Sequence, residues 1–434
     1  MSTIIFPTIN SDIAFYNPSN FKITLCQIST NEFLKLNDIP NDLENAKKTS
    51  IFNHETRHYV DHIATLWGQK YILKYAKAID THLSLDYLKY SRLVDYSLDS
   101  KRLFYKEYYN EVYSSSKFKM GDKPWLYKTV MAHRFDNEGN SDPSSPMIMF
   151  RFIKNDETKE NIARVPLSIV SLLETNSTFE EIKIRAISIA NQEESTKLVE
   201  YIKFNRELLC DLVYNQNLAV YNVAVHLTAN VLNLTDIANA IEISSIFATI
   251  ALNMPSELLS EMYISPDNYT NWKDEIPYLI QNFDYGFIFM NLLYNYKIKF
   301  EGDKVNIQDI LESSNLGDYE TFFDKVKKES NEIYKELEKQ NNFRNILLKE
   351  LSQGQKLLEK LGVGFEKMTI FKALTELRII PHYEFSDTPL DLKDYDKNFL
   401  YGATPHFTED FSEWVECSSL IEDGINNFFQ IRGV

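Results

Sequence analysis

The sequence predicts a mainly α-helical protein of the α+β class, with a small N-terminal sheet, a β-hairpin and a C-terminal helical region. Apolar residues recur at helical spacing through most of the chain after Val165. β-branched runs lie within the first 35 residues, and two further strand-like runs flank a turn-rich segment between residues 125 and 153. We therefore expect helices to form the core and strands to be confined to two small regions.

Length and composition indicate a globular protein that buries a sizeable core. Of the 434 residues, 44% are hydrophobic and 25% are charged, which are ordinary globular values. The net charge of -16 argues against nucleic-acid binding, because no basic cluster offsets it. A protein or peptide, and in particular a basic one, is the partner that this charge favours.

Cysteine usage and hydropathy predict the compartment. Cys26, Cys210 and Cys417 are too few and too scattered for a disulfide framework, and their odd number fits a reducing environment. The N-terminus lacks a basic segment followed by an apolar one, and no run of 18 apolar residues occurs. We expect a soluble, cytoplasmic protein without a membrane partner.

The first elements in chain order are expected to be strands, followed by a long helix. β-branched runs at Thr3 to Phe6 and Phe21 to Ser29 are separated by turn-forming residues, as in short paired strands. Ser50 is a suitable N-cap for a helix that continues past Gly68, where the glycine permits a kink. This small sheet would lie just before the helix in the chain.

The rest of the chain is expected to be a hairpin and then helices. The strand-like runs between residues 125 and 153 form the hairpin, and helices return from Val165. The apolar stretch 217–253 contains Glu242 and several Asn and Thr, so it predicts a buried helix pair and not a membrane span. One long charged amphipathic helix is predicted at roughly 318–360, and the remainder is predicted to be irregular.

A histidine-rich segment carries the strongest functional signal. His54, Glu55 and His58 form the pattern H-E-x-x-H, with Thr56 and Arg57 between them. Residues four apart lie on the same face of a helix, so both imidazoles can reach one metal ion while Glu55 lies beside them. The competing interpretation is an amphipathic helix whose histidine face is solvated.

Other polar residues share this face of the helix. His62 lies eight positions from His54, about 12 Å along the helix axis, which is too far to bind the same ion. Asp61 follows Arg57 by four residues, so it either pairs with that guanidinium or accepts a hydrogen bond from an imidazole N–H. Neither residue is expected to be a direct ligand.

The motif resembles that of the HEXXH zinc metallopeptidases, and the resemblance is limited to this helix. In that family the two histidines bind Zn²⁺, and the glutamate acts as general base toward the bound water. The resemblance implies a zincin-like catalytic domain, placed at residues 1–300, and leaves 301–434 as a C-terminal helical region. Asp61 and Ala64 stand where the metzincin subclass has Gly and His, so the gluzincin subclass is the closer match.

The gluzincin resemblance implies that a later glutamate is the third metal ligand. Glu174 is the better candidate, because it is the lone acid at the end of an apolar run, where an unpaired carboxylate would be costly. Glu207 is the rival, because it opens an E-x-x-x-D pattern with Asp211 that occurs in such enzymes. Both candidates remain open from the sequence.

The resulting hypothesis is a zinc-dependent metallopeptidase that cleaves a protein or peptide. A regulated intracellular effector protease is one form that this hypothesis can take. His54, His58 and Glu174 would hold Zn²⁺, with Glu55 as base. His226 on its apolar helix is a candidate transition-state donor, although a buried core histidine explains it more simply. The alternative function is a non-catalytic helical interaction protein whose histidine face is solvated or binds a structural metal.

Overall fold

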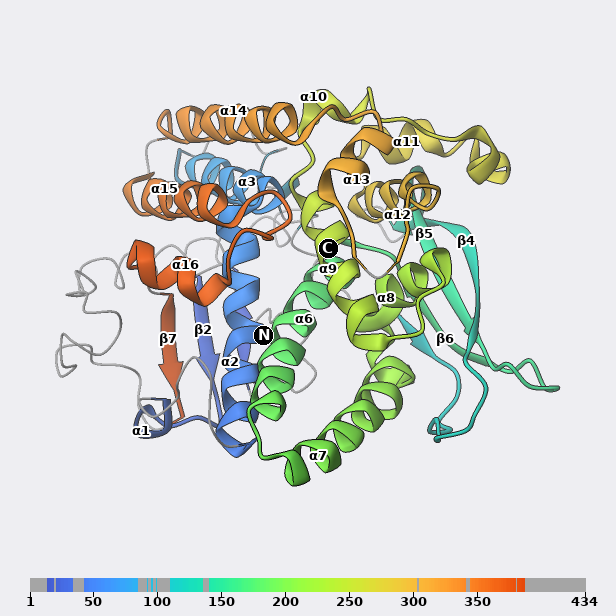
Figure 1. Cartoon of the computed structure of the whole chain (residues 1–434). Coiled ribbons are helices and arrows are strands. Elements are labelled where there is room, and N and C mark those ends of the chain that lie inside the picture. Colours follow the sequence, from blue (N-terminus) through green and yellow to red (C-terminus); the bar gives the residue numbers. More distant parts are fainter. Residues whose placement is uncertain are drawn as a thin grey trace. The chain divides into compact units, whose positions relative to one another are not determined.

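The computed structural model describes residues 14–18, 21–33, 43–84, 92, 95–96, 99, 110–135, 140–302, 304–340, 344–379 and 381–386. Helices make up most of this part, and the strands form one three-stranded and one four-stranded sheet (Figure 1). The predicted fold class, mainly α within α+β, is confirmed. The predicted strand at Thr3 to Phe6 lies outside the described residues.

Two compact units divide the chain. The first unit comprises residues 1–38, 55–104 and 326–434, and the second comprises 39–54 and 105–325. The first unit joins segments from both ends of the chain, because strand β7 (His382–Phe385) pairs in parallel with β2 (Lys22–Leu25). Sequence periodicity cannot reveal such a long-range pairing.

The first unit combines the three-stranded sheet with helices from both ends of the chain. Its sheet has the order β1-β2-β7, where β1 is Phe15–Asn17. Strand β2 lies within the region Phe21 to Ser29, which was predicted to be a strand, so that prediction is confirmed in part. The helices that lie in or enter this unit are α1 (Thr30–Phe33), α2 (Leu43–Ala64), α3 (Leu66–Ser84), α14 (Tyr319–Leu337), α15 (Arg344–Leu361) and α16 (Ile370–Leu377).

Several predicted boundaries in these elements were wrong. Helix α2 begins at Leu43, so Ser50 lies inside the helix, where its hydroxyl donates to the carbonyl of Lys47 at 2.8 Å, and is not its N-cap. The single helix predicted at 318–360 is two helices, α14 and α15. The region after them, predicted to be irregular, contains α16 and β7.

The break between α2 and α3 falls at Thr65, close to the predicted kink. The Thr65 hydroxyl donates to the carbonyl of Asp61 at 2.6 Å and accepts from the backbone N–H of Gly68 at 3.2 Å. A Cβ at position 68 would lie 1.9 Å from the carbonyl oxygen of His62. Glycine is therefore required here because the chain passes too close for any side chain.

The second unit contains the four-stranded sheet, in the order β3-β6-β5-β4. The predicted hairpin is confirmed as β4 (Leu126–Phe135) and β5 (Ser141–Ile153), which pair antiparallel. Strand β6 (Asn161–Pro166) extends the sheet on the other side of β5, and the short β3 (Glu111–Val112) pairs with β6. Strand β6 was not predicted, because its residues directly precede the helical pattern in the sequence.

A helical layer packs beside this sheet and supplies the core of the second unit. Helices α6 (Ile169–Ala190), α8 (Ala219–Leu232), α9 (Ile237–Leu252) and α12 (Tyr285–Tyr296) contact one another, and α8 also contacts β6 (Figure 1). Helix α7 (Glu194–Glu207) continues into the π-helical turn η2 (Leu208–Val213). The remaining elements are η3 (Gln216–Leu218), α10 (Ser256–Leu259), η4 (Pro266–Trp272), α11 (Ile276–Gln281) and α13 (Ile307–Ser313).

The apolar stretch at 217–253 forms the predicted buried helix pair. Most side chains of α8 and α9 are buried within the second unit. Among the described residues, no single helix has the length and apolar composition to cross a membrane, whereas residues Gln216–Leu232 and Ile237–Leu252 meet that test only together, with a bend of 104° between them.

Candidate metal centre

The H-E-x-x-H segment is helical and buried. His54, Glu55 and His58 lie in the middle of α2 and expose 4%, 2% and 1% of their surfaces. The interpretation of a solvated histidine face is therefore wrong for these residues. Because burial of ionisable groups is costly, such a face requires polar partners or an ion inside the protein.

Helix α6 brings Glu174 to this face of α2. The helix begins after Ser168, whose backbone N–H donates to the hydroxyl of Ser171 at 2.9 Å, so its first turn is well capped. Glu174 follows one turn later and is completely buried. Its Oε2 lies 3.5 Å from Nε2 of His54, within the second unit.

His54, His58 and Glu174 form a buried group that could hold a metal ion. Each offers one ligand atom, and the three atoms lie within 4.8 Å of one another. Ligands at about 2.0–2.1 Å from a tetrahedral zinc are themselves about 3.3 Å apart, so the 3.5 Å between His54 and Glu174 suits such a site. Two imidazoles and one carboxylate also form a donor set that binds transition metals.

Glu181, two turns after Glu174 on α6, contacts the other nitrogen of His54. Its Oε2 lies 3.5 Å from Nδ1, so the imidazole lies between two carboxylates. Burial of the Glu181 carboxyl raises its pKa, but the adjacent His54, with Arg185 and Lys47 nearby, outweighs burial, and the pKa lies below its usual value. A carboxylate in this position fixes the ring orientation and tautomer of a ligand histidine.

Sequence reasoning missed Glu181, although a signal was present. It lies seven residues after Glu174, and residues seven apart share one face of a helix. The adjacent Glu180 contacts Lys183 instead, with 3.3 Å between its carboxylate and the ammonium group. Pairing of Glu174 with Glu181 on one helix face could have nominated both.

Buried polar contacts fix α6 at the level of Glu174. The side-chain oxygen of Asn176 accepts hydrogen bonds from the hydroxyls of Ser245, at 2.9 Å, and Thr249, at 3.4 Å, on α9. The Thr175 hydroxyl lies 3.4 Å from the carbonyl oxygen of Tyr221, on α8. Such satisfied polar contacts between helices restrict how one can slide past the other, so they hold the Glu174 carboxylate in place.

The first unit anchors the second half of α2. The guanidinium of Arg57 contacts the carboxylate of Asp61 at 2.9 Å and lies over the ring of Phe365, with 4.6 Å to its centroid. Tyr59 donates to the carboxylate of Glu350 on α15 at 2.9 Å. Of the two predicted roles for Asp61, the structure shows the pairing with Arg57.

His62 lies among aromatic rings and is not part of the candidate metal group. Its Nδ1 is 2.6 Å from the hydroxyl of Tyr16, and its ring stacks on Phe21 with 4.7 Å between centroids. Burial lowers the pKa of His62 to about 3, because the charged imidazolium would lose its hydration. The predicted exclusion of His62 as a ligand agrees with this geometry.

The rival residues Glu207 and Asp211 lie elsewhere. Glu207 is exposed and forms an ion pair with Arg185, and Asp211 lies in the π-helical turn η2. Among the residues that the structure describes, the group that could hold a metal consists of His54, His58 and Glu174, and neither Glu207 nor Asp211 belongs to it. Glu174 is therefore the third member of the group.

His226 lies in an aromatic cluster of the second unit. Its Nε2 is 3.0 Å from the carbonyl oxygen of Val213, and its ring stacks on Trp125 and contacts Phe152. Burial lowers the pKa of His226 to about 4, although the contact with Val213 acts in the opposite direction. These contacts are those of a core histidine, and they do not support a transition-state donor.

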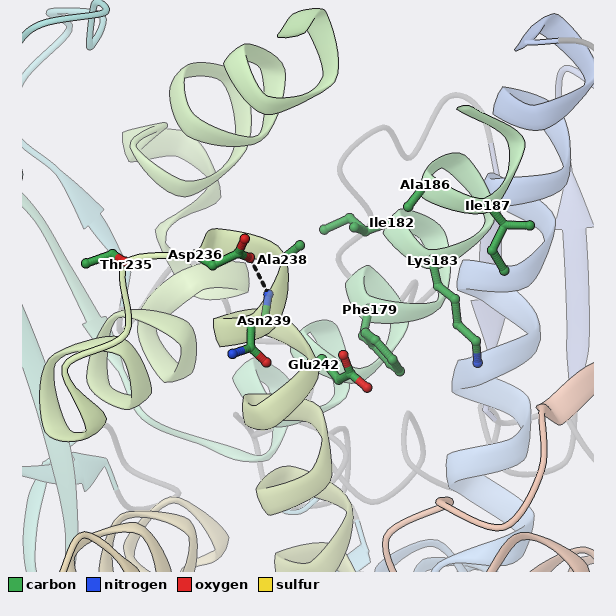
Figure 2. Close-up of a pocket in the computed structure, with 10 residues that line it drawn as sticks. All are labelled: Phe179, Ile182, Lys183, Ala186, Ile187, Thr235, Asp236, Ala238, Asn239 and Glu242. Atoms are coloured by element: carbon green, nitrogen blue, oxygen red, sulfur yellow. Dashed lines mark hydrogen bonds between the residues drawn. The ribbon is translucent and has the colours of Figure 1, made fainter. Parts of the chain in front are cut away.

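A separate pocket lies between α6 and the start of α9, with a volume of about 630 Å³ (Figure 2). Phe179 and Ile182 of α6 and Ala238 of α9 line it, together with the carboxylates of Asp236 and Glu242. None of its lining residues belongs to the metal group. The pocket is thus distinct from the candidate centre, although both use α6.

No protein-family model matches the sequence, and the comparisons with curated proteins and solved structures found no match. The candidate centre therefore has to be interpreted from its own geometry and chemistry.

Proposed function

We propose that this protein is a zinc-dependent metallopeptidase. The observation that carries the proposal is the buried group of His54, His58 and Glu174, with Glu55 next to its first histidine on α2. The H-E-x-x-H pattern alone resembles the peptidase motif. The independent approach of Glu174, which comes from another helix, completes the His₂Glu ligand set of known catalytic zinc sites.

The donor set favours a catalytic over a structural zinc. Structural zinc sites usually have four protein ligands, and most of these are cysteines. Neither Cys26 nor Cys210 belongs to the group, which contains three ligands and no sulfur. Three ligands leave one position for water or substrate, as hydrolysis requires.

Glu55 is the proposed general base. A zinc ion in the site would supply Lewis-acid activation of a bound water and of the substrate carbonyl. Glu55 belongs to no ligand group but is buried beside His54, so its carboxylate can take a proton from the attacking water and return it to the leaving amine. Glu181 holds the His54 ring in orientation.

The proposed substrate is a protein or peptide and the proposed compartment is the cytoplasm. The net charge of -16 favours substrates with basic residues, because it attracts them at long range. The small, odd number of cysteines in the sequence supports a reducing compartment. A metal that only stabilises a helical interaction protein is the competing function, and the experiment below distinguishes the two.

The test combines metal analysis with a cleavage assay. Protein purified without added metal should contain about one zinc per chain and should cleave a denatured, fluorescently labelled protein such as casein. A chelator should abolish cleavage, and added zinc should restore it. Zinc at full occupancy without cleavage of any protein or peptide would favour the structural alternative, whereas the absence of metal uptake would exclude both.

A further inference from the structure

The solvent-facing side of α7 carries a set of large apolar side chains. Leu198, Val199, Tyr201 and Ile202 expose 64%, 50%, 51% and 60% of their surfaces. The one buried side chain of α7, Phe204, packs in a core cluster of the second unit. Isolated exposed apolar residues are ordinary, but four within five positions of one helix indicate a contact surface.

The four side chains occupy one face of the helix. At about 100° per residue they span roughly 160° of the circumference, and Phe204 lies on the opposite side. Helix α7 contacts α6 and η2, so its core-facing side is already occupied. The exposed face, which we call the α7 face, is defined by Leu198, Val199, Tyr201 and Ile202.

Local charge permits two copies of this helix to approach each other. Although the whole chain has a net charge of -16, α7 contains three acidic and three basic residues and is neutral. Lys197 pairs with Glu194 at 3.6 Å and Lys203 with Glu200 at 2.6 Å. The four residues of the α7 face are uncharged, and the charged residues that share its arc, Glu194 and Arg206, lie at opposite ends of the helix, so pairing two copies would bury no unpaired ion.

The residue pattern of α7 is symmetric about Glu200. Leu198 and Ile202 lie two positions before and after it, while Glu194 and Arg206 lie six positions before and after it. A two-fold axis at the level of Glu200 would bring Leu198 of one copy level with Ile202 of the other. At each end of the contact it would also bring Glu194 level with Arg206, which has the opposite charge.

We propose that the α7 face pairs with the α7 face of a second copy of this chain in an antiparallel, two-fold symmetric dimer. Every contact between the two copies then occurs twice per dimer, as in any isologous interface. A helix of 14 residues is about 21 Å long, so the interface is small and the dimer is of moderate affinity. The proposal does not depend on the proposed catalytic function.

Sedimentation equilibrium of the full chain tests the proposal. Wild-type protein should change from monomer to dimer between about 1 and 200 µM. Ile202→Glu should weaken dimerisation at least about 100-fold, because the charge is placed in the interface twice. Ile298→Glu is the matched control, because Ile298 is 91% exposed outside α7, and it should dimerise like wild type.

Cysteine cross-linking tests the antiparallel register. In a background with Cys26, Cys210 and Cys417 replaced by serine, one chain carries Leu198→Cys and another carries Ile202→Cys. Oxidation of the mixture should give the disulfide-linked heterodimer, whereas each chain alone should remain largely unlinked, because a helical turn separates identical positions. Efficient linking of Leu198→Cys to itself would contradict the antiparallel arrangement.

Three outcomes would overturn the proposal. The first is a wild-type monomer throughout the concentration range. The second is a dimer that Ile202→Glu leaves intact, since another surface would then form it. The third is a monomer that sediments with phosphatidylcholine vesicles only when Ile202 is unchanged, since the α7 face would then be a membrane-binding surface.

Discussion

The Nδ1 atom of His54 lies 3.5 Å from Oε2 of Glu181, on α6. The opposite nitrogen of the same ring faces Glu174 at a similar distance, so the imidazole has a carboxylate at each nitrogen. A metal ligand and its orienting carboxylate have this arrangement in many metal sites. It gives Glu181 a position that differs from that of Glu174, the candidate ligand, and the difference can be measured.

Glu181→Gln should lower zinc affinity about 10- to 100-fold without unfolding the protein, because the amide keeps the shape but loses the charge that supports the His54 ring. Competition with a chromogenic chelator measures the affinity. Glu180→Gln is the matched control, because the Glu180 carboxylate pairs with Lys183. Equal affinities in the two variants would remove Glu181 from the site.

Glu174→Ala should lose zinc almost completely, because it removes one of three ligands from the group. Glu207→Ala should keep the wild-type zinc content, since Glu207 is exposed and pairs with Arg185. Elemental analysis of the two purified variants provides the measurement. Metal loss in the Glu207 variant alone would show that the ligand set is wrong.

Two buried histidines predict that stability falls at acidic pH. The pKa of His62 is lowered to about 3 and that of His226 to about 4, whereas both are near 6.5 in the unfolded chain. Below pH 6.5 the unfolded chain therefore binds protons that the folded chain does not bind. The contribution of the two neutral histidines to the free energy of unfolding is complete above pH 6.5 and is lost as the pH falls toward 3 to 4. The expected loss by pH 4 is on the order of 3 kcal/mol per histidine.

Urea unfolding of the metal-free protein between pH 7.5 and 4 measures this dependence. The free energy of unfolding should decrease below pH 6.5, and His62→Gln should make the decrease smaller, because it removes one of the two titrating side chains. A pH dependence identical to wild type in this variant would contradict the assignment of His62 as a neutral, buried group.

Gly354→Ala should destabilise the protein by about 1–3 kcal/mol, because the new Cβ would lie 1.8 Å from the carbonyl oxygen of Ile63 on α2. Lys356→Ala, at an exposed position of the same helix, is the control and should change stability little. Urea unfolding of both variants at pH 7.5 provides the comparison. An unaffected Gly354 variant would mean that α15 packs less closely on α2.

Local patterns in the sequence predicted the elements that depend on local interactions. The hairpin of β4 and β5 and the buried pair of α8 and α9 follow from short-range alternation and apolar periodicity. The parallel pairing of β2 with β7 joins segments more than 350 residues apart in the chain, such as Lys22 and His382. No local pattern encodes that contact, so the sequence could not predict that β7 joins the N-terminal sheet.

The candidate site also contains residues that local spacing predicts and one residue that depends on contacts between helices. The spacing of His54 and His58 is a local property of one helix, so the sequence predicted their common face. The nomination of Glu174 rested on the cost of burying a lone acid, and Glu174 belongs to the buried group that could hold a metal ion. Glu181 was missed because its function depends on the distance between α2 and α6, which the sequence does not specify.

Cleavage by Glu55→Gln, compared with wild type at equal zinc content, tests the central claim most directly. The amide keeps the size of the side chain but cannot accept the proton, so the rate should fall on the order of 10²- to 10⁴-fold while zinc and fold are retained. His54→Ala, in contrast, should lose both zinc and activity. If Glu55→Gln cleaves like wild type where His54→Ala does not, Glu55 is not the base, and the proposed mechanism is contradicted.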